Sequence, residues 1–181
     1  MRHLKTYEAL ITLNLEQNDL ILLMDDAVSK NKPYLVKTLL QNGLDPNYRP
    51  NINNSTQILK AAYYGDTKLE IVKLFIEYGA DLNITTDNKT MIEMLLENIR
   101  VDYQTLQEAA KDLQRMSNVI ILLIKSGEEI SPKFMEDLLS LTKRHKNIRT
   151  TAIELFDRIK NECTEQYEKY LLDMESKKYN L

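Results

Sequence analysis

The chain has 181 residues, of which 43% are hydrophobic, and its net charge at pH 7 is -3. This length and apolar content suffice for one domain with a hydrophobic core, and no apolar run approaches the roughly 20 residues that a transmembrane helix needs. The acidic balance excludes the overall basic surface of many nucleic-acid-binding domains, and the N-terminal residues lack the apolar segment of a secretory signal peptide. We therefore expect a single cytoplasmic domain over residues 1–181, monomeric alone, with no membrane and no nucleic acid among its partners.

Residues suited to catalysis or metal binding are few. Cys163 is the single cysteine, so an intramolecular disulfide cannot form, and the two histidines form no cluster with the ligand spacing of a zinc site. Nothing around Cys163 indicates an activated thiol, and a lone thiol on a helix is most often part of the packing. A glycine-rich phosphate loop and a nucleophile elbow are also missing. We expect no catalytic, cofactor-binding or metal-binding residue, so the chain is not expected to be an enzyme.

The first expected element is a helix over residues 6–17, which we interpret as part of an N-terminal cap, residues 1–21, at the open end of a stack of helices. Beyond it, three apolar helices end in the same way at a glycine, where a helix closes in the left-handed conformation that glycine adopts at little cost. The three segments align without gaps and place Gly43, Gly79 and Gly127 in register: YLVKTLLQNGLDPN (34–47), EIVKLFIEYGADLN (70–83) and NVIILLIKSGEEIS (118–131). Such an internal repeat indicates stacked helical units.

The segment STQILKAAYYGD, residues 55–66, resembles the first helix of the ankyrin repeat. The residues that match the family pattern are Thr56 at its threonine, Ile58 at its leucine, Ala61 and Ala62 at its paired alanines and Gly65 at the glycine between the helices. Gln57 and Leu59 depart from the family, which has proline and histidine at those positions. The resemblance covers residues 22–131 and implies an all-α, ankyrin-type solenoid, whose units combine two antiparallel helices with a projecting hairpin. In the second repeat, Leu74 and Phe75 are then expected to be buried between neighbouring repeats.

The other two copies depart further from the family pattern. In the first copy, Asn31 replaces the glycine between the helices, and asparagine tolerates the left-handed region better than most residues. In the third copy, the first helix corresponds to residues 89–98, and an insertion over residues 99–116 separates it from the second helix. The apolar residues of the insertion keep helical spacing, so we expect it to extend a helix. These residues are Leu106, Ala109, Ala110 and Leu113.

Two helices are expected after the third copy. Ser131 and Pro132 form an N-cap and first-turn pair, which predicts a helix through Leu141. Thr151 and Glu154 have the spacing of a capping box, which predicts that a second helix begins there and runs toward Met174. We interpret residues 132–181 as a divergent repeat or a C-terminal helical cap. The basic segment between the two helices, residues 142–149, is interpreted as a polar connection near a helix C-terminus, with a phosphate-binding patch as the alternative.

The resemblance also implies which residues contact a partner. Stacked repeats present a concave surface of first helices and hairpin tips, and the two positions before each inter-helix turn face that surface. Tyr63 and Tyr64 are the best anchors because tyrosine offers a large contact area at low entropic cost; alternatively, both pack within the stack. The expected partner-binding residues are Ser29, Lys30, Tyr63, Tyr64, Glu97 and Asn98 before the turns, and Tyr48, Arg49, Thr85 and Thr86 at the hairpin tips.

The function that follows is non-enzymatic binding of another protein through the concave face and the hairpin tips. The abundance of Asn, Lys and Ile is typical of AT-rich genomes, which is compatible with a pathogen or viral adaptor that acts on host proteins in the host cytoplasm. The alternative is an effector or enzyme inhibitor whose activity lies in the insertion over residues 99–116 and in the C-terminal helices.

Overall fold

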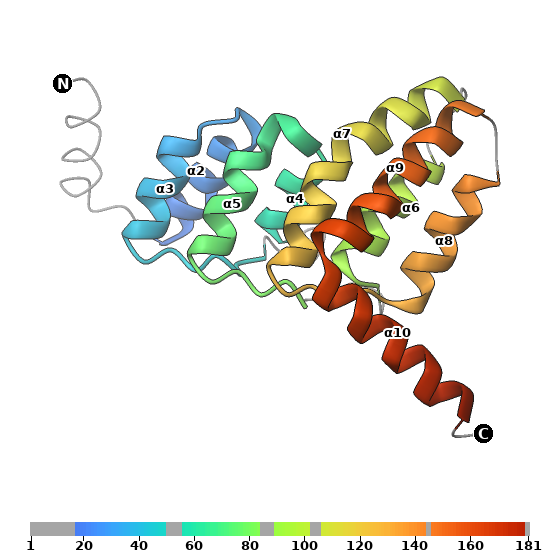
Figure 1. The fold of residues 1–181 in the computed structure, drawn as a ribbon. Coiled ribbons are helices and arrows are strands. Elements are labelled where there is room, and N and C mark those ends of the chain that lie inside the picture. The colour runs from blue at the N-terminus through green and yellow to red at the C-terminus, as the bar shows by residue number, and fades with distance from the viewer. Residues whose placement is uncertain (1–16, 50–55, 84–88, 102–105, 144–145, 180–181) are drawn as a thin grey trace. The chain divides into compact units, whose positions relative to one another are not determined.

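The computed structural model describes residues 17–49, 56–83, 89–101, 106–143 and 146–179. These ranges fold into helices, and the predicted all-α class is confirmed (Figure 1). The elements are α2 (Gln17–Ser29), α3 (Pro33–Gln41), α4 (Gln57–Ala62), the 3-10 helix η1 (Gly65–Lys68), α5 (Leu69–Glu77), α6 (Met91–Val101), α7 (Leu106–Lys125), α8 (Pro132–Thr142), α9 (Lys146–Glu162) and α10 (Thr164–Tyr179). The cap helix predicted over residues 6–17 lies almost entirely outside the described residues.

The chain divides into two compact units. The first unit consists of Met1–Ala61 and Glu70–Ala80, and the second of Ala62–Leu69 and Asp81–Leu181. The expectation of one domain over residues 1–181 remains a prediction.

The repeated glycines close their helices by one shared pattern of hydrogen bonds. Each glycine has a positive φ, which is +85° at Gly43, +83° at Gly79 and +108° at Gly127. The glycine N–H donates to the carbonyl three residues earlier, and the next N–H donates to the carbonyl five residues before it. This pair of bonds is the Schellman motif, which satisfies carbonyls that a helix end leaves unpaired. The three glycines that align in the sequence therefore also have the same backbone conformation and the same hydrogen bonds.

Asn31 closes α2 in the same way. Its φ is +53°, its N–H donates to Val28 O at 3.3 Å, and Lys32 N–H donates to Ala27 O at 2.9 Å. Asparagine thus replaces the left-handed glycine in the first copy, as the sequence predicted.

Gly65, at the start of η1, cannot carry a side chain without a local shift. Its φ is +58°, and a Cβ there would lie 2.6 Å from the backbone oxygen of Arg115 on α7. The absence of a side chain therefore allows η1 to pack against α7 within the second unit.

We expect Gly65→Ala to lower the free energy of unfolding by more than about 1 kcal/mol, because it adds the strain of a positive φ to a backbone clash. Urea denaturation followed by circular dichroism measures this change. Gly43→Ala is the matched control, because Gly43 also has a positive φ but a Cβ there would meet no atom within 4 Å, and it should lower stability by less than Gly65→Ala does. An unchanged urea midpoint for Gly65→Ala would contradict the close packing of η1 on α7.

The second unit is built around α7, the helix that contains most of the insertion. α7 has 20 residues and packs against η1, α6 and α9, while α8 packs against α6 and α9 (Figure 1). Within the insertion, α6 continues to Val101 and α7 begins at Leu106, so its described residues are helical, as predicted. Along α7, Leu113, Met116, Ile120 and Leu123 are fully buried.

The start of α8 agrees with the sequence-based prediction, whereas the start of α9 does not. Ser131 Oγ accepts a hydrogen bond from Phe134 N–H at 3.0 Å and caps α8, which confirms that start. The prediction that the second helix begins at a capping box of Thr151 and Glu154 was wrong, because α9 already begins at Lys146. The apolar face of α9 starts at Ile148, which is 2% exposed, and burial of this face extends the helix ahead of Thr151. The predicted run to Met174 is also interrupted at Cys163, between α9 and α10.

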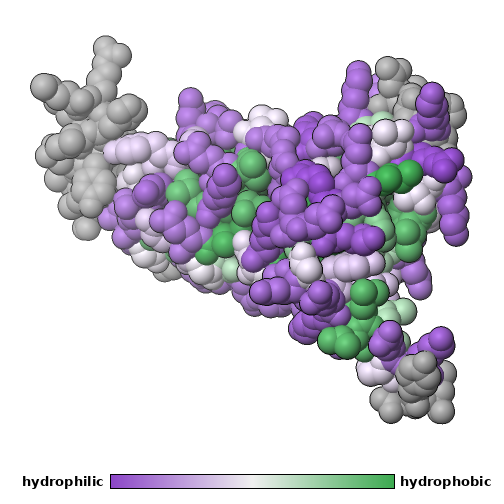
Figure 2. Space-filling model, viewed as in Figure 1, coloured by the Kyte–Doolittle hydropathy of each residue, from purple (hydrophilic) through white to green (hydrophobic). Residues whose placement is uncertain are grey.

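The exposed surface includes one apolar region on α10. Leu171, Leu172 and Met174 are 43%, 66% and 38% exposed, and Figure 2 shows apolar surface where α10 leaves the other helices of its unit. Among the described residues, none of the helices combines the length and the apolar character required to span a membrane.

Candidate functional site

The end of α2 presents two of the predicted binding residues to solvent. Ser29 and Lys30 are both exposed. Lys30 Nζ lies 2.8 Å from Asp26 Oδ1, one turn earlier on the helix. An exposed pair of this kind contributes little to stability, so exchanging it for a partner's carboxylate would cost the fold little.

An ion pair in the first unit was not found from the sequence. Lys60 Nζ on α4 lies 2.6 Å from Asp25 Oδ1 on α2, and Gln57 Nε2 donates to the same oxygen at 3.2 Å. The hydrogen bond from Lys60 is the largest of the effects that lower the pKa of Asp25. Gln57, which replaces the family's proline, is 3% exposed, and its Oε1 has no hydrogen-bond partner among the described residues. This polar contact therefore joins α2 to α4.

Tyr48 and Arg49 follow a turn whose geometry the residues before them determine. Asn47 N–H donates to Asp45 Oδ1 at 2.8 Å, and Tyr48 N–H donates to Asp45 O at 3.2 Å. Both predicted binding side chains are half-buried. The second copy repeats the turn, since Asn83 N–H donates to Asp81 Oδ1 at 2.9 Å. The other predicted tip residues, Thr85 and Thr86, lie outside the described residues.

Tyr63 and Glu97 are two predicted binding residues that the structure brings together. Burial is the main cause that raises the pKa of the Tyr63 hydroxyl, and the nearby Glu97 carboxylate raises it further. Glu97 Oε2 lies 2.6 Å from Lys89 Nζ, and these two side chains are 47% and 44% exposed. Lys89 was missed because it belongs to the loop before α6 rather than to a first-helix end. The hydroxyl therefore remains a hydrogen-bond donor at neutral pH beside an accessible ion pair, and Asn98 lies half-buried next to Glu97 in the chain.

Tyr64 has a structural contact that the binding prediction did not include. Lys68 Nζ lies 3.3 Å from the centroid of the Tyr64 ring, and Lys68 is only 2% exposed. A cation over an aromatic face is attracted by the ring quadrupole, more strongly when the pair is shielded from water. The ring, which is 45% exposed, therefore covers a buried ammonium group on one side. This contact supports the alternative interpretation of Tyr64 as a packing residue.

A buried carboxyl group lies at the N-terminus of α6. Glu128 is 1% exposed, and its Oε1 accepts a hydrogen bond from Ile92 N–H at 2.8 Å. Its Oε2 has no hydrogen-bond partner in the described part of the chain. Burial, as the main cause, raises the pKa of Glu128 to about 8, against the opposing hydrogen bonds from Ile92 and Met91. Neighbouring Glu93 raises it further.

Glu93 itself belongs to a network that connects α6 with α8. Thr90 Oγ1 accepts from Glu93 N–H at 3.3 Å, and Thr90 N–H donates to Glu93 Oε2 at 2.8 Å, which is a capping box. Ser131 Oγ, the cap of α8, donates to Glu93 Oε1. The first helix of the third copy is therefore held at its start by carboxylates from two segments.

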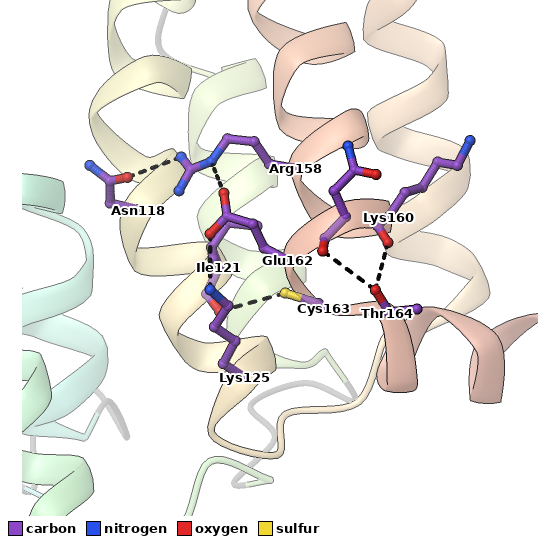
Figure 3. A network of polar contacts seen from close by, with 9 residues as sticks. Asn118, Ile121, Lys125, Arg158, Lys160, Glu162, Cys163 and Thr164 are labelled. Atoms are coloured by element: carbon purple, nitrogen blue, oxygen red, sulfur yellow. Dashed lines mark hydrogen bonds and ion pairs between the residues drawn. The ribbon is translucent and has the colours of Figure 1, made fainter.

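A polar chain on the surface connects η1, α7 and α9, and Figure 3 shows the part of it that lies between α7 and α9. Asn118 Nδ2 donates to Asp66 Oδ2 at 3.0 Å, and Arg158 donates to Asn118 Oδ1 at 3.0 Å. Arg158 Nε and Lys125 Nζ then lie 2.7 and 2.9 Å from the two carboxylate oxygens of Glu162. The hydrogen bonds from Arg158 and Lys125 lower the pKa of Glu162 to about 2. These exposed contacts orient α7 against α9 and offer no reactive group.

Cys163 lies beside this chain but inside the packing. It is 1% exposed, and its Sγ lies 3.9 Å from the Ile121 carbonyl oxygen (Figure 3). Burial raises the pKa of the thiol, which disfavours the nucleophilic thiolate. In the described ranges, no three His, Cys, Asp or Glu side chains are grouped so that they could hold a metal ion.

Comparison with known proteins finds a match to a repeat family in the first half of the chain. The sequence model of the family described as ankyrin repeats (many copies) matches residues 24–76. A protein of Acanthamoeba polyphaga mimivirus, named as an ankyrin repeat protein, is 32% identical over 101 residues. The match covers 53% of this chain and 17% of that protein, so the chain spans only a small part of the relative's length. No solved structure gives a significant match.

Proposed function

We propose that this chain, whose residues 24–76 form ankyrin repeats, is a non-enzymatic module that binds a partner protein. Ankyrin repeats typically bind proteins, and stacked repeats present extended surfaces for that purpose. The observation that carries the proposal is the group of Tyr63, Glu97 and Lys89, in which an aromatic hydroxyl just after α4 lies near an accessible ion pair between Glu97 on α6 and Lys89 in the loop before α6. Aromatic residues at the centre of an interface, surrounded by polar groups, are typical binding hot spots.

The chemistry of this group indicates the partner surface that fits it. The half-buried Tyr63 supplies apolar area and a hydroxyl donor. Glu97 and Lys89 neutralise each other in the unbound state. A partner can replace this ion pair by supplying a basic group that pairs with Glu97 and an acidic group that pairs with Lys89. Ser29 and Lys30, and Tyr48 and Arg49, are further contact residues in this proposal.

The proposal extends to the setting in which the chain acts. The similarity to a mimivirus protein and the abundance of Asn, Lys and Ile support a viral adaptor that binds proteins of its host, in the host cytoplasm. Because the match covers 17% of that relative, the similarity supports the origin of the chain and not a particular partner.

We expect Tyr63→Ala to weaken partner binding about thirtyfold, which corresponds to about 2 kcal/mol, the loss typical of a hot-spot aromatic. The partner would be captured from an Acanthamoeba lysate with the wild-type chain, identified by mass spectrometry, purified and titrated calorimetrically. Tyr64 stays unchanged in this variant because its ring covers Lys68.

Two controls make the result specific. Lys73→Glu changes an exposed residue of α5 outside the proposed contact residues and should leave the affinity within about twofold. Tyr63→Phe retains the ring and should lose only the hydroxyl contribution. Wild-type affinity in Tyr63→Ala, or release of the partner by Lys73→Glu, would remove the first-helix ends from the binding surface.

A further inference from the structure

The second unit contains a groove that the proposed function does not use. It has a volume of about 600 Å³ and lies between α7 and α9, which run side by side in Figure 1. One face of each helix lines it, with Ala110, Lys111 and Gln114 on α7 and Lys146, Thr150 and Glu154 on α9. The residues on α7 all belong to the insertion over residues 99–116, which the ankyrin unit does not require.

The hollow has a simple steric cause. Ala110 presents only a methyl group to the groove, whereas its neighbours Lys111 and Gln114 have long, exposed side chains. On the opposite side, Lys146, Thr150 and Glu154 recur every fourth residue and therefore share one face of α9. The result is a channel with a shallow floor and polar walls.

The walls carry two lysines, Lys111 and Lys146, and one carboxylate, Glu154, so their net charge is positive. Lys111 and Lys146 are exposed, and neither side chain forms an ion pair or a hydrogen bond with another described residue. By contrast, exposed lysines elsewhere, such as Lys125 and Lys169, lie 2.9 and 2.8 Å from a carboxylate oxygen. Lys143 and Arg149, which flank Lys146 in the chain, are exposed as well. The groove is therefore a positive site on a chain whose net charge is -3.

We propose that this groove binds an acidic, extended segment of a partner protein. Carboxylates of the segment pair with Lys111 and Lys146, while Gln114 and Thr150 hydrogen-bond to its backbone. Glu154 lies roughly 12 Å farther along α9 than Lys146, at a rise of 1.5 Å per residue, so the segment is acidic at one end and neutral or basic at the other. A nucleic acid fits less well because its regularly spaced phosphates would also face Glu154.

This inference does not depend on the contact at Tyr63, and it assigns a role to the insertion. The extended helix adds a second binding surface, made by residues that the repeat pattern leaves out. The two surfaces can be tested separately, because Tyr63 is not among the residues that line the groove.

The test measures fluorescence anisotropy of a labelled twelve-residue peptide of alternating Glu, Asp, Ser and Gly, titrated with the full chain at low salt. We expect Lys111→Glu/Lys146→Glu to weaken binding at least about tenfold, and added salt to weaken it in the wild type. Ala110→Met fills the floor of the groove without changing charge and should weaken binding several-fold. Glu154→Gln should strengthen binding of this uniformly acidic peptide.

The matched control is Lys37→Glu/Lys177→Glu, which makes the same change in net charge at two exposed lysines outside the groove. It should leave the affinity within about twofold, as should Tyr63→Ala. If the control and the groove variant lost the same amount of peptide affinity, the loss would be due to net charge alone, and the proposal would be overturned. Absence of binding to the wild type at up to about 1 mM peptide, or tighter binding of a twelve-nucleotide DNA strand, would also overturn it.

Discussion

Replacement of Phe75 by alanine is expected to lower the free energy of unfolding by about 3 to 5 kcal/mol. Phe75 lies on α5 and is 1% exposed, and its neighbours Ile71 and Val72 are fully buried. Deletion of the ring removes apolar contact and leaves a cavity that the surrounding helices fill only in part. Because domains are stable by only about 5 to 15 kcal/mol, this loss would consume a large share of the total.

Chemical denaturation of the purified variants measures this effect directly. Leu22→Ala is the control, since Leu22 on α2 is 69% exposed and its truncation should change stability by no more than about 0.5 kcal/mol. If Phe75→Ala unfolded at the same denaturant concentration as the wild type, the assignment of α5 to the core would be wrong.

The second large effect is a fall in stability as the pH rises through the neutral range. Glu128 has a pKa of about 8 in the folded chain, against an ordinary value of 4.5. The folded state therefore binds more protons than the unfolded state between these values, and the free energy of unfolding decreases with pH there. The stabilisation is complete below about pH 4.5 and is lost by about pH 8, with a slope approaching about 1.4 kcal/mol per pH unit.

Urea denaturation at several pH values from 5 to 8 tests this dependence. Glu128→Gln preserves an oxygen acceptor for Ile92 N–H and removes the titration, so its stability should vary less with pH than that of the wild type. Glu129→Gln is the neighbouring control, because Glu129 is exposed and its hydrogen bond from Lys169 lowers its pKa out of this window. If the stability of Glu128→Gln and of the wild type depended on pH in the same way, the pKa of Glu128 would not be raised by folding, and the prediction would be wrong.

The sequence predicted the backbone of the repeats well, for a physical reason. A left-handed helix end strongly favours glycine or asparagine, and four such positions were identified correctly: Gly43, Gly79, Gly127 and Asn31. The burial of Leu74 and Phe75 followed from the apolar face of one helix and is confirmed by exposures of 8% and 1%. Local geometry and periodicity therefore determined most of the fold.

The contacts that the sequence did not reveal join residues that are distant in the chain. Lys60 meets Asp25, and Glu128 reaches the N-terminus of α6, through side chains whose positions depend on the packing of separate helices. No periodic signal distinguishes such a carboxylate from an exposed one. The start of α9 was misplaced for a related reason, because burial of Ile148 outweighed the local capping signal at Thr151.

The candidate binding surface shows the same division. Family position selected Tyr63, Tyr64 and Glu97, but only the three-dimensional arrangement separates them into a hydroxyl beside an ion pair and a ring over Lys68. Lys89 became a candidate only through its distance from Glu97.

Photo-crosslinking tests the central claim, that first-helix ends contact the partner, most directly. A benzophenone amino acid would replace Tyr63 in one variant and Lys73 in another, and each would be irradiated with the purified partner. We predict a crosslinked complex from position 63, reduced by excess unlabelled wild-type chain, and none from position 73. Crosslinking from position 73 with none from position 63 would contradict the account.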